Sequence, residues 1–211
     1  MNTVTTLFGA WRLVPVIVIE SVATVAPLAE ALVHGGLPCA EVTLRTPAAL
    51  AAVRAFAERP GMVVGAGSVR TAEQVDQAVE AGACFIVSPG ISDAVLDRCR
   101  DLDVPALPGV ATATEVMRAL DAGLDVVKLF PAGILGGAAG LRSLAAPFPT
   151  MRFVPTGGIG PSDLAEYLKA PAVLAVGGSW MVAPHLIEAG RFDEIERLTR
   201  DAVSTALEAR P

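Results

Sequence analysis

Short apolar segments rich in β-branched residues recur along the chain, and segments with a helical pattern of apolar positions lie between them. This alternation predicts strands and helices in turn. The predicted strands start about 20 to 26 residues apart, which is the length of one βα unit. Eight strands are predicted, at residues 14–19, 40–44, 62–66, 84–88, 104–107, 126–130, 152–156 and 172–176.

The segments between these strands include six predicted helices, at residues 25–36, 47–61, 71–83, 92–103, 112–124 and 161–171. Several end in glycine, and several begin with Thr, Ser or Pro, which are the usual residues at those positions. Two segments lie outside the repeat. The first twelve residues are expected to form a short helix that covers the bottom of the fold. Residues 193–209 are expected to form an amphipathic helix after the last strand.

Eight strands that alternate with helices predict an α/β fold in which a parallel sheet is covered on both faces. Eight is also the number that closes a (β/α)8 TIM barrel, and such barrels commonly form one unit of about 200 to 250 residues. We therefore expect residues 1–211 to form a single barrel domain. The alternative is an open doubly wound sheet. Closure is favoured because no GxGxxG motif opens the first unit and the spacing stays regular.

Composition and charge narrow the classes of partner. Hydrophobic residues make up 53% of the chain, yet the longest apolar stretches are well short of the roughly 18 residues that cross a bilayer. No membrane contact is therefore expected. The net charge is −6 with acidic and basic residues intermixed, which argues against nucleic acid as a partner. An anionic substrate stays compatible, because a few donors focused in a cleft outweigh a weak average charge.

The N-terminal segment bears on the cellular location of the protein, and the cysteines bear on whether its thiols are reduced. No basic run precedes the first apolar segment, so no secretory leader is expected and the predicted location is cytoplasmic. Cys39, Cys84 and Cys99 are odd in number and lie in or beside apolar segments, which favours reduced structural thiols. With no CxxC motif and only His34 and His185, no metal site is expected.

The end of the second strand contains two charged residues. In a barrel of this kind the chemistry lies at the C-terminal ends of the strands. The strand ends in EVTLRT, and alternation places Glu41, Thr43 and Arg45 on one face. If that face points inward, a carboxylate and a guanidinium lie near the barrel mouth. The alternative is a buried Glu–Arg pair that only holds the core together.

The sixth strand contains a single lysine, Lys128, in the run DVVKLFPAG. Alternation places Val126 and Phe130 on the same face. Apolar surroundings disfavour the charged form of a lysine and expose the lone pair that attacks a carbonyl carbon. The alternative is a lysine that extends to the rim of the barrel or pairs with Glu41.

Small residues follow four of the strands. The seventh strand ends in Thr156-Gly157-Gly158 and the eighth in GGS at 177–179. Bare backbone N–H groups at these places suit a phosphate, which barrel enzymes often bind after strands seven and eight. Each pair of glycines alone would also fit a tight turn, but the two together favour phosphate. Ser68 after the third strand, and Ser88 and Pro89 after the fourth, leave room for a ligand; a plain loop is the alternative for Ser88 and Pro89.

The predicted set is therefore one amine, one carboxylate, one guanidinium and a phosphate cradle at one end of a barrel. An amine beside an acid/base group suits Schiff-base chemistry on a ketone, and a guanidinium suits bidentate binding of a carboxylate. The ligand that fits this set is a phosphorylated 2-keto acid.

With these features the chain resembles the 2-keto-3-deoxy-6-phosphogluconate (KDPG) aldolase and 4-hydroxy-2-oxoglutarate aldolase family. The similarity extends from VPVIVIE at 14–20 to GGSWMV at 177–182, most of the chain. Its motifs are EVTLRT (41–46), VGAGS (64–68), SPGIS (88–92), LPGVATATE (107–115), KLFPA (128–132), GG (136–137), VPTGGI (154–159) and VGGSW (176–180).

The resemblance implies a role for each matching residue. Lys128 is similar to the Schiff-base lysine, Glu41 to the general acid/base and Arg45 to the carboxylate ligand. The positions that match the pyruvyl pocket are Ser68, Pro89 and Phe130, and those that match the phosphate end are Thr156, Gly157, Gly158, Gly178 and Ser179. Two positions depart from the family: Ser68 is usually Thr, and Gly133 is often Glu. The first affects the fit around the pyruvyl group, and the second affects contacts of the loop after the sixth strand.

The implied activity is that of a class I aldolase of the Entner-Doudoroff pathway, which cleaves KDPG to pyruvate and glyceraldehyde 3-phosphate without metal or organic cofactor. The resemblance also implies action on 4-hydroxy-2-oxoglutarate and a homotrimer. Three other functions stay open. They are the related phosphogalactonate aldolase, a phosphate-binding barrel isomerase or synthase without covalent catalysis, and a noncatalytic binder of phosphorylated ligands.

Overall fold

The structure is a computed structural model that describes residues 4–209. Its strands are β1 (Leu13–Ile17), β2 (Cys39–Thr43), β3 (Val63–Gly67), β4 (Ile86–Val87), β5 (Ala106–Leu107), β6 (Gly109–Val110), β7 (Val126–Leu129), β8 (Arg152–Pro155) and β9 (Val176–Gly178). Its α-helices are α1 (Val4–Gly9), α2 (Val25–His34), α3 (Ala49–Ala57), α4 (Ala72–Glu80), α5 (Asp93–Asp101), α6 (Ala113–Asp121), α7 (Gly137–Ala145), α8 (Leu164–Leu168), α9 (Pro184–Glu188) and α10 (Phe192–Glu208). Two short 3-10 helices are η1 (Val22–Thr24) and η2 (Trp180–Val182).

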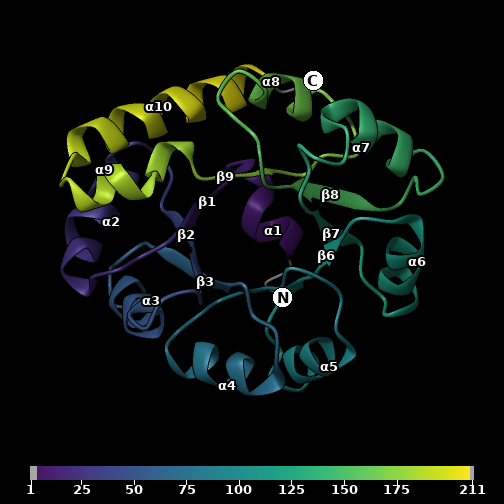
Figure 1. The fold of residues 1–211 in the computed structure, drawn as a ribbon, viewed down its shortest axis with the longest axis horizontal. Coiled ribbons are helices and arrows are strands. Elements are labelled where there is room, and N and C mark those ends of the chain that lie inside the picture. Colours follow the sequence, from purple (N-terminus) through teal and green to yellow (C-terminus); the bar gives the residue numbers. More distant parts are fainter. Residues whose placement is uncertain (1–3, 210–211) are drawn as a thin grey trace.

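The strands close into a ring, with the helices around the outside (Figure 1). All pairings are parallel, in the orders β5-β4-β3-β2-β1-β9 and β6-β7-β8. β5 and β6 are two parts of one strand that Pro108 separates, and single bridges from Phe153 to Val173 and from Thr156 to Gly177 join the β8 and β9 segments. The predicted (β/α)8 barrel is therefore confirmed, and the open doubly wound sheet is wrong.

Alternate residues of each strand face two different cores. The inner core lies inside the ring and includes Val14, Phe85, Val126 and Val154. The outer core, between strands and helices, includes neighbours such as Leu13, Ile17, Val42 and Val127. A parallel sheet covered on both faces requires this arrangement, because each strand must be apolar on both sides.

Helix α1 closes the N-terminal end of the ring, and Figure 1 shows it at the centre of the view. Phe8 of α1 is fully buried, and its ring meets that of Phe85 edge to face with centroids 4.9 Å apart. The helix expected in the first twelve residues lies here, and residues 1–3 of that segment are outside the described residues.

Several predicted boundaries were wrong by a few residues. The eighth strand was predicted at 172–176, but β9 is Val176–Gly178. Its glycines pair with β1, although they have no apolar side chain that would mark a strand in the sequence.

Helix α7 was not predicted, because four glycines at 133–140 lower the helical propensity of that segment. The short α9 was also not predicted.

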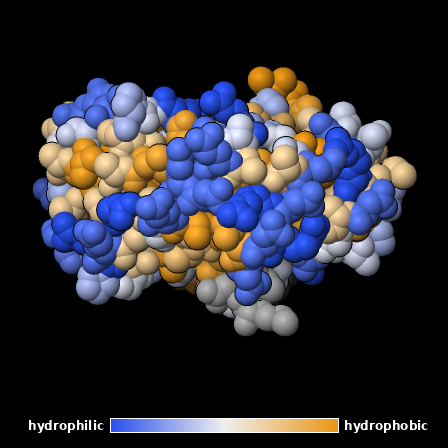
Figure 2. Space-filling model, turned by 90° about the horizontal axis from the view of Figure 1, so that it is seen from below, coloured by the Kyte–Doolittle hydropathy of each residue, from blue (hydrophilic) through white to orange (hydrophobic). Residues whose placement is uncertain are grey.

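The outer surface of the helices is mixed in character. On the side shown in Figure 2, hydrophilic residues are interspersed with hydrophobic ones. Ion pairs connect neighbouring helices there: Arg98 of α5 lies 2.6 Å from Asp76 of α4, and Arg118 of α6 lies 2.9 Å from Asp93 of α5. Among the helices of residues 4–209, none has the length and apolar character needed to cross a membrane.

Candidate active site

Lys128 lies inside the barrel on β7, which is buried along its whole length. The Lys128 Nζ atom donates a hydrogen bond to Glu41 Oε1 at 3.1 Å, and the two residues are only 5% and 2% exposed. The Phe130 ring centroid lies 5.4 Å from the same nitrogen, at the distance of a cation–π contact. The structure therefore brings together the amine and the carboxylate predicted from two distant strands.

Glu41 lies on β2, where it is in register with Val16 of β1 and Gly65 of β3. Its carboxylate pairs with Lys128 and not with Arg45 in the described structure, so the alternative of a structural Glu–Arg pair is wrong. A buried ion pair is compatible with a structural role as well as a catalytic one. The surroundings of the amine distinguish the two roles.

Lys128 borders a cavity. A cavity of about 180 Å³ lies at the C-terminal ends of the strands, and Lys128 forms part of its wall. Other predicted site residues that line this cavity are Arg45, Phe130, Thr156, Gly157, Gly158, Gly178 and Ser179. A purely structural lysine would not need a cavity beside it, whereas a nucleophile needs room for its substrate.

Arg45 lies beyond the end of β2 and is exposed. Its Nε atom donates a hydrogen bond to Ser68 Oγ at 3.0 Å. Ser68 has a φ of 59°, a left-handed conformation that few non-glycine residues adopt. The contact holds the Arg45 side chain in one direction at the cavity wall. This role of Ser68 was not predicted from the sequence.

Three predicted site residues are not among the described residues that line the cavity. They are Glu41, Ser68 and Pro89, and Pro89 is exposed. Sequence reasoning did not predict four wall residues, which are Val16, Val18, Ile159 and Pro184, whereas Gly177 was predicted as one of the glycines after the eighth strand. Most of them are apolar, and no chemical signal in the sequence distinguishes them from core residues.

The loop after β8 has a conformation that requires glycine. Gly157 and Gly158 have φ values of 93° and 72°, in the region that a side chain disfavours. The loop after β7 supports this turn, because Gly133 N–H donates to the Gly157 carbonyl at 2.9 Å. A Cβ at Gly133 would lie 2.9 Å from the Gly158 oxygen, so the glycine at this position allows a close fit of the two loops.

Cys39 lies two residues before Glu41 on the same face of β2 and is fully buried. Burial, and next the negative charge of Glu41, raise the pKa of the Cys39 thiol far above its ordinary value. The thiol is therefore neutral at physiological pH, which argues against Cys39 as a nucleophile and leaves Lys128 as the candidate.

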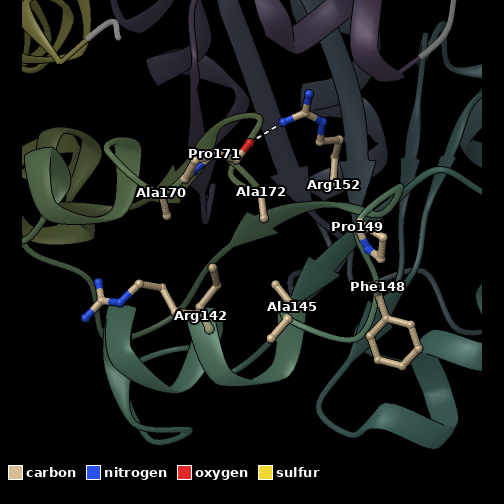
Figure 3. Close-up of a pocket in the computed structure, with 10 residues that line it drawn as sticks. Arg142, Ala145, Phe148, Pro149, Arg152, Ala170, Pro171 and Ala172 are labelled. Atoms are coloured by element: carbon tan, nitrogen blue, oxygen red, sulfur yellow. Dashed lines mark hydrogen bonds between the residues drawn. The ribbon is translucent and has the colours of Figure 1, made fainter.

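A second cavity lies at the opposite end of the barrel, where β8 begins (Figure 3). It has a volume of about 390 Å³ and is bordered by the loops before β8 and β9, with Arg142, Phe148 and Arg152 among its lining residues. The Arg152 guanidinium donates to the Pro171 carbonyl there. None of the predicted site residues lines it.

Residues 4–209 contain no group of three His, Cys, Asp or Glu side chains that could hold a metal ion.

Comparison with known proteins gives the family. The sequence matches the family KDPG and KHG aldolase over residues 4–198. The chain belongs to this aldolase family. A 2-dehydro-3-deoxy-phosphogluconate aldolase of Zymomonas mobilis is 52% identical over 168 residues, which are 80% of this chain and 81% of that relative. Another from Treponema pallidum is 48% identical over 193 residues, 91% of this chain and 92% of the relative.

A solved structure of another KDPG aldolase is close in fold. The enzyme from Legionella pneumophila, with pyruvate captured at low pH as a covalent carbinolamine intermediate, is 40% identical and superposes with a TM-score of 0.90. The match covers 93% of this chain and 96% of that one. The resemblance noted in the sequence is therefore confirmed at the level of the KDPG and KHG aldolase family.

Proposed function

We propose that this protein is a class I aldolase that cleaves KDPG to pyruvate and glyceraldehyde 3-phosphate through a Schiff base on Lys128. The observation that supports the proposal most directly is that Lys128 contacts Glu41 through its amine at 3.1 Å and is also one of the residues that line the cavity at the barrel mouth. The family supports the same activity, and its name extends the proposal to 4-hydroxy-2-oxoglutarate, which would yield pyruvate and glyoxylate.

The reaction begins when Lys128 passes a proton to Glu41 and the neutral amine attacks the C2 ketone; Glu41 then returns this proton to the oxygen that leaves as water. Loss of water gives a protonated imine, which accepts the electrons of the C3–C4 bond when that bond breaks. Glu41, directly or through a water molecule, removes the proton from the C4 hydroxyl, and glyceraldehyde 3-phosphate leaves. The enamine that remains takes a proton at C3, and water then releases pyruvate and the free amine.

The other site residues bind the two ends of the substrate. The Arg45 guanidinium, held by Ser68, binds the carboxylate next to the reacting ketone, and Phe130 and Pro89 flank the pyruvyl group. The phosphate lies at the glycine loops, where Thr156, Gly157, Gly158, Gly178 and Ser179 present backbone N–H groups or hydroxyls. These roles place the ketone at the amine and the phosphate at the outer part of the cavity.

Trapping the imine tests the proposal. With pyruvate and borohydride, we expect the chain to gain about 72 Da on Lys128, the mass of a reduced pyruvyl group, measured by peptide mass spectrometry. Lys128→Met is expected to trap nothing, and Glu41→Gln is expected to trap pyruvate but to cleave KDPG at least about 100-fold more slowly. Absence of trapping in the unmodified protein would exclude a Schiff-base aldolase and favour a barrel isomerase or synthase. Assays of KDPG and 4-hydroxy-2-oxoglutarate side by side then give the preferred substrate.

The family resemblance also supports proposals about assembly and location. We infer that the whole chain acts as one barrel domain, that three chains form a homotrimer, and that the enzyme acts in the cytoplasm. Light scattering of the purified protein is expected to give about 65 kDa, three times the 21.6 kDa of one chain. A mass of one or two chains would contradict the trimer and leave the proposed chemistry unaffected.

A further inference from the structure

The carboxylate of Glu41 lies directly over the Cα atom of Gly67, the last residue of β3. A Cβ added to Gly67 would lie 2.3 Å from Glu41 Oε1, 2.8 Å from its Cγ and 2.9 Å from its Cδ. All three distances are far inside van der Waals contact. The position that a side chain of residue 67 would take is therefore the position that the Glu41 carboxylate occupies.

The register of the strands explains this contact. Glu41 pairs with Gly65, and Gly67 pairs with Thr43, two residues nearer the barrel mouth. The Glu41 side chain therefore leans toward the mouth as it extends over β3, which is the direction of Lys128 and the cavity. Gly67 has no positive φ, so its backbone is compatible with an alanine, and the glycine is needed for space rather than for conformation.

We propose that Gly67 is a positioning residue for Glu41: its missing side chain is the space through which the carboxylate reaches the Lys128 amine. The consequence for catalysis rests on the proposed function. A methyl group at Gly67 could be accommodated in two ways: the strands β2 and β3 move apart, or the Glu41 side chain turns away. The strands β2 and β3 pair along their full length from Cys39 to Thr43, which resists separation, so the Glu41 side chain must turn away instead. The acid/base group then leaves the site while the amine stays.

The first measurement is the kinetics of Gly67→Ala. We expect kcat for KDPG cleavage to fall about 100-fold, the size of a lost general acid/base, with little change in KM. Trapping of pyruvate by borohydride is expected to persist, because Lys128 is not displaced. Gly9→Ala is the matched control. Gly9 also lacks a positive φ, its added Cβ would meet only the Leu174 side chain at 3.9 Å, and it lies at the other end of the barrel.

The second measurement separates an effect through Glu41 from a general structural effect. In a Glu41→Ala background the group that the new methyl would meet is absent. We therefore expect Gly67→Ala to cause no further loss of kcat and no further fall in melting temperature in that background. An equal loss in both backgrounds would overturn the proposal, and so would a Gly67→Ala enzyme with unchanged kcat.

Failure to fold also gives a decisive result. If Gly67→Ala is unfolded while the Glu41→Ala, Gly67→Ala double variant folds, the contact with Glu41 is the cause and the proposal stands. If both are unfolded, Gly67 has another role and the proposal is wrong. Pyruvate trapping by the unmodified protein tests the aldolase function by itself, so its failure is distinguishable from a failure at Gly67.

Discussion

Lys128 and Glu41 each compensate the charge of the other inside the barrel. Removing one partner of a buried pair leaves an unpaired charge in a medium that solvates it poorly, which typically costs about 3–5 kcal/mol. Replacing both partners by uncharged residues of similar size costs much less. The pair therefore constrains stability as well as chemistry, and the two effects can be measured separately.

The stability of the pair is tested with two variants. We expect Lys128→Met to lower the free energy of unfolding by about 3–5 kcal/mol, and the double variant Lys128→Met, Glu41→Gln to recover much of that loss, in urea titrations. The exposed pair of Arg142 and Glu166 is the control, and Arg142→Met is expected to change stability by less than about 1 kcal/mol. A double variant that is no more stable than Lys128→Met would show that the charges are not coupled.

The three thiols differ in reactivity because they differ in burial. Cys84 is exposed, whereas Cys39 and Cys99 are buried. Burial raises the pKa of Cys99 to about 11, and burial followed by the charge of Glu41 raises that of Cys39 further. At pH 8 we expect a thiol reagent to modify one cysteine per chain rapidly and all three only after denaturation. Cys84→Ser is expected to abolish the rapid phase, and a rapid phase that persists would contradict this order.

Strand alternation predicted which residues share a face with Lys128 and with Glu41, because both lie within regular strands, but it left open whether those faces point inward. The structure places both residues inside the barrel. The contact between Arg45 and Ser68 was beyond such reasoning, since both residues follow the ends of their strands and Ser68 has a left-handed backbone. The space at Gly67 was equally hidden. A sequence shows that a glycine is present but not which neighbouring side chain fills the vacant volume.

At the scale of one element, α6 has a complete N-terminal capping box. Thr112 Oγ1 accepts a hydrogen bond from the Glu115 N–H, and the Glu115 carboxylate accepts hydrogen bonds from the N–H groups of Ala111 and Thr112. The hydrogen bond from Ala111, followed by those from Thr112, lowers the pKa of Glu115 below its ordinary value of 4.5. This reciprocal arrangement satisfies N–H groups that a helix start otherwise leaves without a partner.

The lowered pKa gives a pH dependence with a definite sign. A carboxyl group whose pKa is lower in the folded state stabilises the fold above its unfolded value, near 4.5, and loses that contribution as the pH falls through the folded value. We expect Glu115→Gln to be less stable than the unmodified protein at pH 7, by on the order of 0.5 kcal/mol, and the difference to vanish in acid. Thermal unfolding at several pH values checks this, with Glu30→Gln on α2 as an exposed control. A difference that is independent of pH would contradict the assignment.

The elements that sequence reasoning missed have identifiable causes. The fifth strand is interrupted at Pro108, which has no N–H to donate, so β5 pairs with β4 and β6 pairs with β7. Helix α7 begins after Gly136, which has a φ of 91°, and contains further glycines. Its apolar residues pack against the outer core and override the poor propensity, and this tertiary contribution is not visible in a local sequence window.

At the scale of the whole molecule, the two ends of the barrel have separate tasks. The C-terminal end contains the cavity with Lys128, and helix α1 covers the N-terminal end. Between them lies the inner core, in which the rings of Phe8 and Phe85 meet edge to face. Substitutions at the N-terminal end should therefore change stability with little effect on the chemistry, as expected for barrels of this class.

Helix α1 provides the test of this separation. Phe8→Ala removes a fully buried ring and its edge-to-face contact with Phe85, and we expect the free energy of unfolding to fall by about 3–5 kcal/mol. In the temperature range where the variant stays folded, kcat for KDPG cleavage is expected to stay within about twofold of the unmodified value, because Phe8 lies at the end of the barrel opposite Lys128. Leu207→Ala on α10 is the control, since Leu207 is 51% exposed and its loss is expected to change stability by less than about 0.5 kcal/mol. If Phe8→Ala lowered kcat by an order of magnitude without lowering stability, the inner core would be part of the catalytic machinery rather than its support.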